Sequence, residues 1–317
     1  MWRTYNYAVK GRKHELMARP CQDKTAALAG EGGRAVTVAL ADGAGSVRFA
    51  EAGAECVVAK ILPYLLEKFD MLYDNRDNRS AQDDLIAYLQ KELDQAAHEL
   101  GTDMEEMATT LLFCAVKDGR FLAGHIGDGI IAMHRPGGSE LLSAPADSEF
   151  VNETVFVTDL TAVRHLRLYG GEIRDIDGFM LLSDGSANSL YDHRRHCFSI
   201  AADNIFFMSG IMVVESFREL LIDAFDNLVR KRTADDCSIA LLVLPVNELS
   251  DLPLKIQMEL FGVTNIGRAG RKRTEKYVRV ANLARQGEGI SVISRKLHLK
   301  KKYVRRYLRA FVESGLV

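Results

Sequence analysis

The chain has 317 residues, of which 47% are hydrophobic and 26% charged, and its formal net charge is −2. This length and apolar content suit one large domain with a buried core plus a second, small domain, and no apolar run is long enough to span a bilayer. Because the N-terminus enters an alternating strand pattern without a signal peptide, and the five cysteines form no C-x-x-C pair, we expect a cytoplasmic protein with reduced thiols.

Strand and helix patterns follow one another along the first two thirds of the chain. Residues 34–41 are typical of a buried strand, and residues 50–67 repeat apolar side chains at helical spacing. A second helix is predicted for residues 80–100, where leucines recur every four positions after a capping pattern. Residues 108–134 predict three short strands, and residues 178–183 predict another buried strand. Long helices after the first strands, followed by more strands, favour a layered fold.

Four aspartates lie at the ends or starts of apolar runs: Asp42, Asp128, Asp184 and Asp236. Three of them are followed by glycine, and Asp-Gly after a strand is also a common turn sequence. Buried carboxylates repel one another unless a cation lies between them, and oxygen ligands suit a hard divalent ion. We therefore predict a shared metal site, with an ordinary turn as the alternative for each aspartate taken alone.

Several short motifs occur in a particular order. They are GRKH at 11–14, PCQD at 20–23, ADGAGS at 41–46, and then ATTLL, IGDG, LLSDG and DDCS. Over about residues 5–245 this order resembles the metal-dependent type 2C Ser/Thr protein phosphatases, most closely their short bacterial branch, and residues 148–159 (SEFVNETVFVTD) are also similar to that branch. Each motif is weak alone, but the ordered set is specific.

The resemblance implies an α+β fold, namely a four-layer α-β-β-α sandwich of two antiparallel sheets flanked by helices. We expect a small all-α, helix-turn-helix-like domain to follow it. The predicted boundaries are 1–246 for the type 2C phosphatase-like catalytic domain, 247–273 for a bridging helix and basic linker, and 274–317 for the helix-turn-helix-like domain.

The resemblance also implies a set of residues that would hold two or three Mn²⁺ or Mg²⁺ ions between the sheets: Asp23, Asp42, Gly43, Asp128, Asp184 and Asp236. Asp42 would bridge two of the ions, and the carbonyl of Gly43 would join it. Asp184 and Asp236 would complete the second ion. Asp128 would hold the third ion, and Asp23 would bind an ion directly or support a neighbouring ligand.

A pair of cations would make phosphate monoester hydrolysis possible at this site. Two ions about 3.5–4 Å apart lower the pKa of a bridging water and neutralise the phosphoryl oxygens. The resemblance thus implies hydrolysis of phosphoserine and phosphothreonine in proteins by a metal-bridging water, with a Ser/Thr kinase as the opposing partner. The chain has no G-x-S-x-G elbow or Walker lysine motif, so we expect no covalent phosphoenzyme.

Two positions depart from the wider family. Ala44 stands where many members have a histidine that is a candidate acid for the leaving alkoxide. His14 is the best substitute, because the short bacterial branch has a histidine there; a structural role for His14, or a metal-bound water as the acid, is the alternative. Ala18 stands where the family commonly has a phosphate-binding arginine, so Arg19 or Arg12 would have to reach the phosphate unless each is a solvated surface residue.

The charges divide sharply along the chain. From Asn265 to the end there are 15 Lys or Arg and 3 Glu, whereas the preceding part has 26 basic and 40 acidic residues. Residues 289–317 contain two short helical patterns separated by a break at 298–299, and a helix is predicted before them over 275–285. This pattern predicts a helix-turn-helix and resembles bacterial transcription-regulator modules.

The second helix of this pattern carries basic residues that would meet the bases and phosphates of DNA: Lys300, Lys301, Lys302, Arg305, Arg306 and Arg309. The alternative is a basic helix pair that docks on the acidic domain or on an acidic protein.

Two functions of different classes are therefore predicted. The first is a metal-dependent signalling phosphatase with a basic module for DNA or partner binding. The alternative is a catalytically weak or inactive phosphatase-like sensor domain in a DNA-binding regulator.

Overall fold

The computed structural model describes residues 1–145 and 154–317. The first part of the SEFVNETVFVTD segment, residues 148–153, lies outside the described residues. The chain forms two compact units, of which the first comprises Met1–Phe206 and Leu221–Leu244 and the second comprises Phe207–Leu220 and Pro245–Val317.

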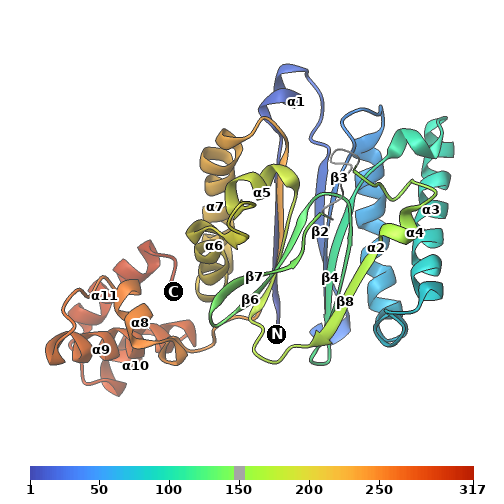
Figure 1. Ribbon diagram of the computed structural model, residues 1–317. Helices are drawn as coiled ribbons and strands as arrows, with labels where there is room; N and C mark the ends of the chain where they lie inside the picture. The colour runs from blue at the N-terminus through green and yellow to red at the C-terminus, as the bar shows by residue number, and fades with distance from the viewer. Residues whose placement is uncertain (146–153) are drawn as a thin grey trace. The chain divides into compact units, whose positions relative to one another are not determined.

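Two five-stranded sheets form the centre of the first unit (Figure 1), and every strand pair in them is antiparallel. One sheet has the order β1–β12–β9–β6–β7, with strands β1 (Arg3–Val9), β12 (Cys237–Val243), β9 (Gly178–Leu182), β6 (Ile130–Arg135) and β7 (Gly138–Ser143). The other has the order β2–β3–β4–β5–β8, with strands β2 (Asp23–Ala29), β3 (Ala35–Asp42), β4 (Leu111–Lys117), β5 (Arg120–Ile126) and β8 (Arg167–Glu172).

Strand β3 shows why the sheets pack as a sandwich. Successive side chains of a strand point to opposite faces. Val36, Val38 and Leu40 belong to the apolar cluster that also contains side chains of β9 and β12 in the other sheet. Ala39 and Ala41 belong to the cluster formed with the helices. The strand is therefore buried on both faces, which explains its uninterrupted apolar sequence.

Helices cover the outer faces of both sheets (Figure 1). The β3 sheet is covered by α2 (Ala50–Asp74), and α3 (Arg79–Leu100) packs on α2. Leucines of both helices, such as Leu65 and Leu89, are fully buried in the shared cluster. On the other side lie α5 (Asp184–Leu190) and the parts of α6 (Ile200–Ile211) and α7 (Val214–Ala224) that belong to this unit. The predicted four-layer α-β-β-α sandwich is confirmed.

Short elements complete the first unit: α1 (Arg12–Leu16), α4 (Ala162–His165), the pair β10 (Tyr191–Asp192) and β11 (Cys197–Phe198), the 3₁₀ turns η1 (Glu31–Gly33), η2 (Met104–Met107) and η4 (Arg230–Arg232), and the π-helical turn η3 (Phe225–Val229).

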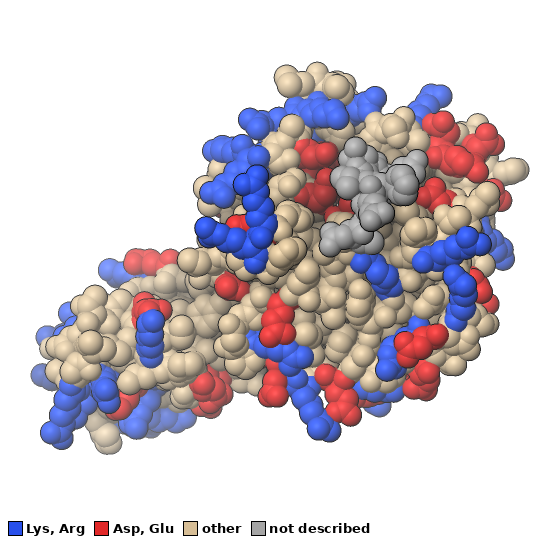
Figure 2. Space-filling model, viewed as in Figure 1, with Lys and Arg blue, Asp and Glu red and all other residues tan. Residues whose placement is uncertain are grey.

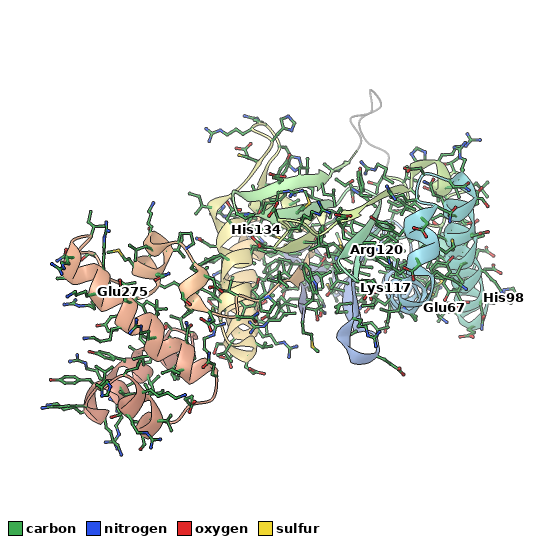
Figure 3. All side chains as sticks on the ribbon, turned by 90° about the horizontal axis from the view of Figure 1, so that it is seen from below. Glu67, His98, Lys117, Arg120, His134 and Glu275 are labelled. Carbon is green, nitrogen blue, oxygen red and sulfur yellow. The ribbon has the colours of Figure 1, made fainter. Side chains whose placement is uncertain are left out.

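The β4–β5 hairpin contacts α2 through ion pairs, a cation–π contact and buried leucines. Lys117 and Arg120, labelled in Figure 3, both form ion pairs with Asp70 of α2. The guanidinium of Arg120 also lies 5.6 Å from the ring centroid of Phe69. Exposed ion pairs contribute little alone, so the cation–π contacts and the buried leucines carry most of this attachment.

The second unit is helical. Besides residues 207–220 it contains η5 (Leu249–Asp251), α8 (Leu254–Leu260), α9 (Arg268–Arg285), α10 (Ile290–Lys296) and α11 (Lys301–Glu313). Its core includes Val278, Ile293, Val304 and Phe311, which come from α9, α10 and α11. Helix α10, the turn after it and α11 have the order that the sequence predicts for a helix-turn-helix.

Helix α9 begins earlier than the sequence suggests, because the basic stretch expected to form a linker up to Arg273 is helical from Arg268 onward. Arginine and lysine are good helix formers, and Gly270 is required where the helix meets the backbone, since an added Cβ would lie 1.5 Å from the carbonyl oxygen of Asn265. None of the helices in the described part of the chain is both long and apolar enough to cross a membrane.

The leucines of α2 should dominate the stability of the first unit. Replacing Leu65, which is fully buried, with alanine should lower the free energy of unfolding by about 2–5 kcal/mol, because a cavity remains in the cluster. Urea unfolding followed by the fluorescence of Trp2, the single tryptophan, measures this change, since Trp2 packs on the apolar cluster between the sheets. The control is Glu67→Ala on the exposed side of α2, for which a change within about 0.5 kcal/mol is expected. Equal effects of the two substitutions would contradict this view of the helix.

Candidate active site

The pairing of β2 with β3 brings two of the predicted carboxylates together at one edge of the sheet. Asp23 opens β2, Asp42 closes β3, and the two residues are direct partners in the strand register. Asp23 is only 1% exposed, yet neither of its carboxylate oxygens makes a hydrogen bond of ordinary geometry to the described residues. A buried carboxylate without donors is costly, so this position is suited to a cation.

The threonines of the ATTLL motif hold the backbone of Asp42. Its N–H donates to the hydroxyl oxygen of Thr110 (2.9 Å), and its carbonyl accepts hydrogen bonds from the N–H of Thr110 (2.9 Å) and the hydroxyl of Thr109 (3.0 Å). Both threonines are buried. With its main chain fixed in this way, Asp42 can direct only its side chain toward a ligand.

Gly43 is required by the close approach of helix α2. A Cβ on this residue would lie 2.6 Å from the carbonyl oxygen of Ala50, the first residue of α2, and 2.9 Å from its side chain. The N–H of Gly43 donates to the carbonyl of Gln22, at 3.2 Å. The Asp-Gly sequence is therefore a site of close packing as well as a turn.

Asp184 is brought to the same region by the contact between α5 and β12. It is the first residue of α5, directly after β9. The N–H of Ser238 donates to the hydroxyl oxygen of Ser183 (3.0 Å), and a Cβ on Gly185 would lie 2.1 Å from the carbonyl oxygen of Asp236. The start of α5 is thus packed tightly against the start of β12.

Asp128 occupies the Gly-Asp-Gly turn between β5 and β6. Gly127 has φ +114°, and a Cβ there would lie 2.5 Å from the side chain of Thr110, so the turn rests on the threonine that holds Asp42. One carboxylate oxygen of Asp128 accepts a hydrogen bond of 2.7 Å from the hydroxyl of Thr154.

Electrostatics unite these carboxylates into one site. Burial first, and then the charges of Asp23, Asp184 and Asp128, raise the pKa of Asp42 well above its usual range. Burial also raises the pKa of Asp23 to about 7 and that of Asp184 to about 6, where Asp128 and Asp235 contribute as well. Figure 2 shows acidic side chains gathered at the upper rim of the sandwich.

This repulsion is what a divalent cation would relieve, so the donor set fits a hard metal ion with oxygen ligands. Among the described residues, no three Asp, Glu, His or Cys side chains already lie close enough to enclose an ion. An ion would therefore have to draw the carboxylates closer together.

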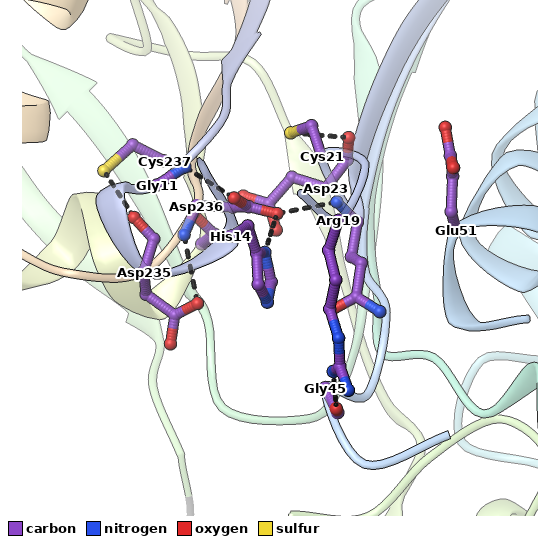
Figure 4. A network of polar contacts seen from close by, with 12 residues as sticks. Gly11, His14, Arg19, Cys21, Asp23, Gly45, Glu51, Asp235, Asp236 and Cys237 are labelled. Atoms are coloured by element: carbon purple, nitrogen blue, oxygen red, sulfur yellow. Dashed lines mark hydrogen bonds and ion pairs between the residues drawn. The ribbon is translucent and has the colours of Figure 1, made fainter. Parts of the chain in front are cut away.

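The adjacent residues Asp235 and Asp236 have different surroundings (Figure 4). Asp236 is 2% exposed, and its oxygens accept hydrogen bonds from the N–H groups of Gly11 and Gln22, each at 2.6 Å. They also lie 2.9 Å from Nδ1 of His14. Asp235 is exposed and contributes to the raised pKa of Asp184.

Asp236, the predicted metal ligand, thus already has three partners, whereas, among the described residues, one carboxylate oxygen of Asp235 accepts a hydrogen bond only from the N–H of Asp236, at 3.0 Å, and its charge raises the pKa of Asp184. Asp235 is not among the residues predicted from the sequence. The adjacent DD pair was the signal that could have found it, but nothing in the sequence indicates which of the two carboxylates is engaged.

The two predicted catalytic residues lie at the start of the chain, in and after α1. His14 is only 4% exposed and is oriented by Asp236 through one ring nitrogen. Arg19 is exposed, and its guanidinium donates to the carbonyl of Gly45 (2.7 Å), just beyond the Asp42–Gly43 pair. Ala18 has a left-handed backbone, with φ +53°, next to Arg19. Arg12 instead donates to the carbonyl of Thr233, at 3.1–3.2 Å.

The predicted nucleic-acid residues share one exposed helix surface in the second unit. Lys300 is the N-cap of α11, and the others lie within α11 with exposed side chains: Lys301, Lys302, Arg305, Arg306 and Arg309. Val304 and Phe311 of the same helix are buried. The guanidinium of Arg306 lies over the rings of Tyr303 and Tyr307.

The unpartnered carboxylate of Asp23 makes the metal-free protein sensitive to pH. Because the pKa of Asp23 is raised from its usual value near 4 to about 7, the native state binds a proton that the unfolded state has lost between these pH values. With chelator present, the contribution of Asp23 to stability should be largest near pH 4–5 and fall as pH rises to about 7, by a few kcal/mol in all at up to about 1.4 kcal/mol per pH unit. Thermal unfolding of wild type and Asp23→Asn at several pH values measures this, and the variant should show a flatter dependence. Asp83→Asn, an exposed position in α3, is the control, and an unchanged dependence in Asp23→Asn would contradict the assignment.

Comparisons with known proteins agree with this architecture. The sequence model of the protein phosphatase 2C family matches residues 10–209, which include Asp23, Asp42, Asp128 and Asp184 but not Asp235. No curated protein matches the chain in sequence.

Several solved structures share the fold. A bacterial serine phosphatase is 15% identical, with a TM-score of 0.55 over 77% of this chain and 98% of that chain. The serine/threonine phosphatase Stp1 from Staphylococcus aureus is 15% identical, with a TM-score of 0.54 over 78% and 96%. The serine/threonine phosphatase of S. agalactiae is 19% identical, with a TM-score of 0.53 over 77% and 100%. At such identities these structures establish the likeness of fold alone. Because the family model covers more than half of the sequence and the sandwich agrees with it, the chain belongs to the protein phosphatase 2C family.

Proposed function

We propose that this chain is a Mn²⁺- or Mg²⁺-dependent protein phosphatase that hydrolyses phosphoserine and phosphothreonine in proteins. The observation that carries the proposal is the group of aspartates at one edge of the sandwich, where Asp23 and Asp42 are direct strand partners and the charges of Asp23, Asp184 and Asp128 add to burial in raising the pKa of Asp42. Members of the family act on phosphoproteins, so a Ser/Thr kinase is the expected opposing partner.

The proposed ligands for two or three ions are five carboxylates and one carbonyl: Asp23, Asp42, Gly43, Asp128, Asp184 and Asp235. When bound, the ions would supply charge neutralisation of the phosphate and a water of lowered pKa. Asp42 suits a central role because its backbone is fixed by the buried threonines, which leaves its side chain free to bind.

We propose Asp235 in place of the sequence-predicted Asp236 because of how their oxygens are used. A carboxylate has about four lone-pair sites, and three of those on Asp236 are already taken by Gly11, Gln22 and His14. Asp236 would then act through His14, and Asp235 would complete the ion-binding set together with Asp184.

His14 is the proposed proton donor for the leaving serine or threonine oxygen. Because one ring nitrogen faces Asp236, only the other is available to a substrate. A carboxylate behind the ring fixes its orientation. The sequence has no histidine at position 44 to take this part.

Arg19 is the proposed phosphate ligand. Its guanidinium uses one donor on the Gly45 carbonyl, which holds it beside the loop that follows Asp42. A guanidinium has five N–H donors, so several remain for phosphate oxygens.

For the second unit we propose that the basic surface of α11 contacts DNA, as the sequence suggests for residues 300–309. Support comes from the exposure of all six basic residues on a helix whose apolar side is buried in its own unit. An acidic protein partner is the alternative.

The metal site is tested by the initial rate of phosphothreonine-peptide hydrolysis with Mn²⁺, Mg²⁺ or chelator. Asp42→Asn, Asp184→Asn and Asp235→Asn should each lose at least about a hundredfold in rate and bind Mn²⁺ more weakly by calorimetry, because each loses a direct ligand. Asp236→Asn should retain Mn²⁺ binding and lose about 10- to 100-fold in kcat. Asp83→Asn is the matched control.

Loss of Mn²⁺ binding in Asp236→Asn, with none in Asp235→Asn, would reverse the assignment of the pair. No turnover by wild-type protein that binds Mn²⁺ would favour the alternative function, a phosphatase-like sensor domain.

The role of His14 is tested with two substrates of different leaving group. His14→Gln should lower kcat on the phosphothreonine peptide by about a hundredfold, because an alkoxide must be protonated as it leaves. With p-nitrophenyl phosphate, whose leaving group needs no proton, the loss should be much smaller. His98→Gln at the exposed end of α3 is the control. Equal losses on both substrates would give His14 a purely structural role.

A further inference from the structure

A basic groove lies within the helical unit, between α9, the turn after α10, and α11. Its volume is about 910 Å³, and six cationic side chains line it: Lys272, Arg273, Lys276, Arg279, Lys296 and Arg306. Glu275, labelled in Figure 3, is the one acidic residue among its lining residues. The surface that faces the groove is therefore strongly positive.

Most of this charge has no counter-charge in the described part of the chain. Lys296 forms an ion pair of 2.6 Å with Glu288, but none is formed by the groove residues of α9 or by Arg306. Lys272 and Lys276 are four positions apart on one helix face, and Arg279 follows three positions later. Like charges at this spacing destabilise a helix, so a bound anion would relieve an unfavourable interaction.

Two aromatic rings line the same groove. Tyr277 of α9 and Tyr307 of α11 have ring centroids 4.8 Å apart, with the planes tilted by 59°. Tyr277 also contacts Phe311, which is buried in the core of the unit. The guanidinium of Arg306 lies 5.4 Å from the ring centroid of Tyr307. The two tyrosine rings are thus held in place by the buried Phe311 and have the Arg306 guanidinium beside them.

This combination selects among anionic ligands. Inorganic phosphate or an acidic peptide needs only the cations, whereas a nucleotide offers a flat base for the tyrosines and phosphates for the lysines and arginines. A base in a duplex is stacked between its neighbours and cannot enter a hollow, but a single-stranded or free base can. A volume of this size is also within the usual range of small-ligand pockets.

We propose that the groove binds a nucleotide unit, with its base against Tyr277 and Tyr307 and its phosphates on Lys272, Lys276 and Arg279. The ligand is either a free nucleoside polyphosphate or a single-stranded nucleic acid, which share this chemistry. The site is separate from the exposed row on α11 proposed for duplex DNA, of which only Arg306 lines the groove. It does not depend on phosphatase activity.

The test uses full-length protein at physiological salt, where charges beyond about 8 Å are screened. Fluorescence anisotropy measures binding of two probes, a fluorescent ATP analogue and a labelled single-stranded oligonucleotide. Lys276→Glu/Arg279→Glu reverses two groove charges and should weaken binding by at least about tenfold. The matched control, Arg268→Glu/Arg271→Glu, makes the same charge change on exposed residues of α9 that do not line the groove, and should change binding by less than about twofold.

A third variant tests the aromatic contribution. Tyr307→Leu keeps an apolar side chain and should weaken binding of the preferred probe by about five- to a hundredfold, the effect of losing one base stack, while pyrophosphate binding is unchanged. Circular dichroism melting of each variant establishes that the helices remain folded. Binding of the ATP analogue identifies a free nucleotide as the ligand, and binding of the oligonucleotide alone identifies a strand; either supports the proposal.

Three results would overturn it. Equal loss in the two double variants would assign binding to the general charge of the helical unit. Poly-glutamate that displaces the probes as well as unlabelled oligonucleotide does would assign the groove to acidic proteins. No binding of either probe to wild-type protein would remove the site altogether, without bearing on phosphatase activity.

Discussion

Repulsion between carboxylates at one edge of the sandwich is the constraint on which the rest of the catalytic unit depends. A buried Asp is unfavourable in its charged form, and neighbouring carboxylates make that form less favourable still, as the raised pKa of Asp42 indicates. The fold holds the backbone around them through Thr109 and Thr110 and the packing at Gly43 and Gly185. These contacts are independent of any ion, so the backbone of the site is in place before an ion draws the carboxylate side chains together.

Much of this architecture could be predicted from the sequence, because strands buried on both faces give long apolar runs and the aspartates end or begin them. What could not be predicted is which carboxylate of the DD pair is engaged. Every residue of β12 from Cys237 to Val243 is buried, so no alternation of polar and apolar residues indicates the direction of Asp235 and Asp236. Ala18 is a second example. Its backbone is left-handed and precedes Arg19, but alanine is not a residue type that indicates this conformation in a sequence.

The helical unit differs from the catalytic unit in where its charges lie. Its basic side chains are exposed, whereas carboxylates of the catalytic unit such as Asp23 are buried. Residues 268–273 belong to α9, although their glycine and positive charge suggest a linker. Arginine and lysine have high helix propensity, and Gly270 allows the helix to pass close to the backbone of Asn265. The same residues then stand on one helix face without carboxylates to balance them. Stability of this unit therefore rests on the apolar contacts of Val304 and Phe311, which leaves the cations free to serve a ligand.

Asp236 links the assembly of the active site to closure of the fold. Its three partners, Gly11, His14 and Gln22, lie more than two hundred residues away in the sequence, and Gly11 and His14 follow β1, which is paired with β12. A buried carboxylate without hydrogen bonds would be strongly unfavourable. The hydrogen bonds to Asp236 therefore hold the N-terminal segment in place. Once Asp236 is satisfied, His14 has a fixed orientation, and Asp235 remains close enough to Asp184 to raise its pKa. One buried carboxylate thus positions the proposed proton donor and leaves its neighbour to complete the proposed metal site.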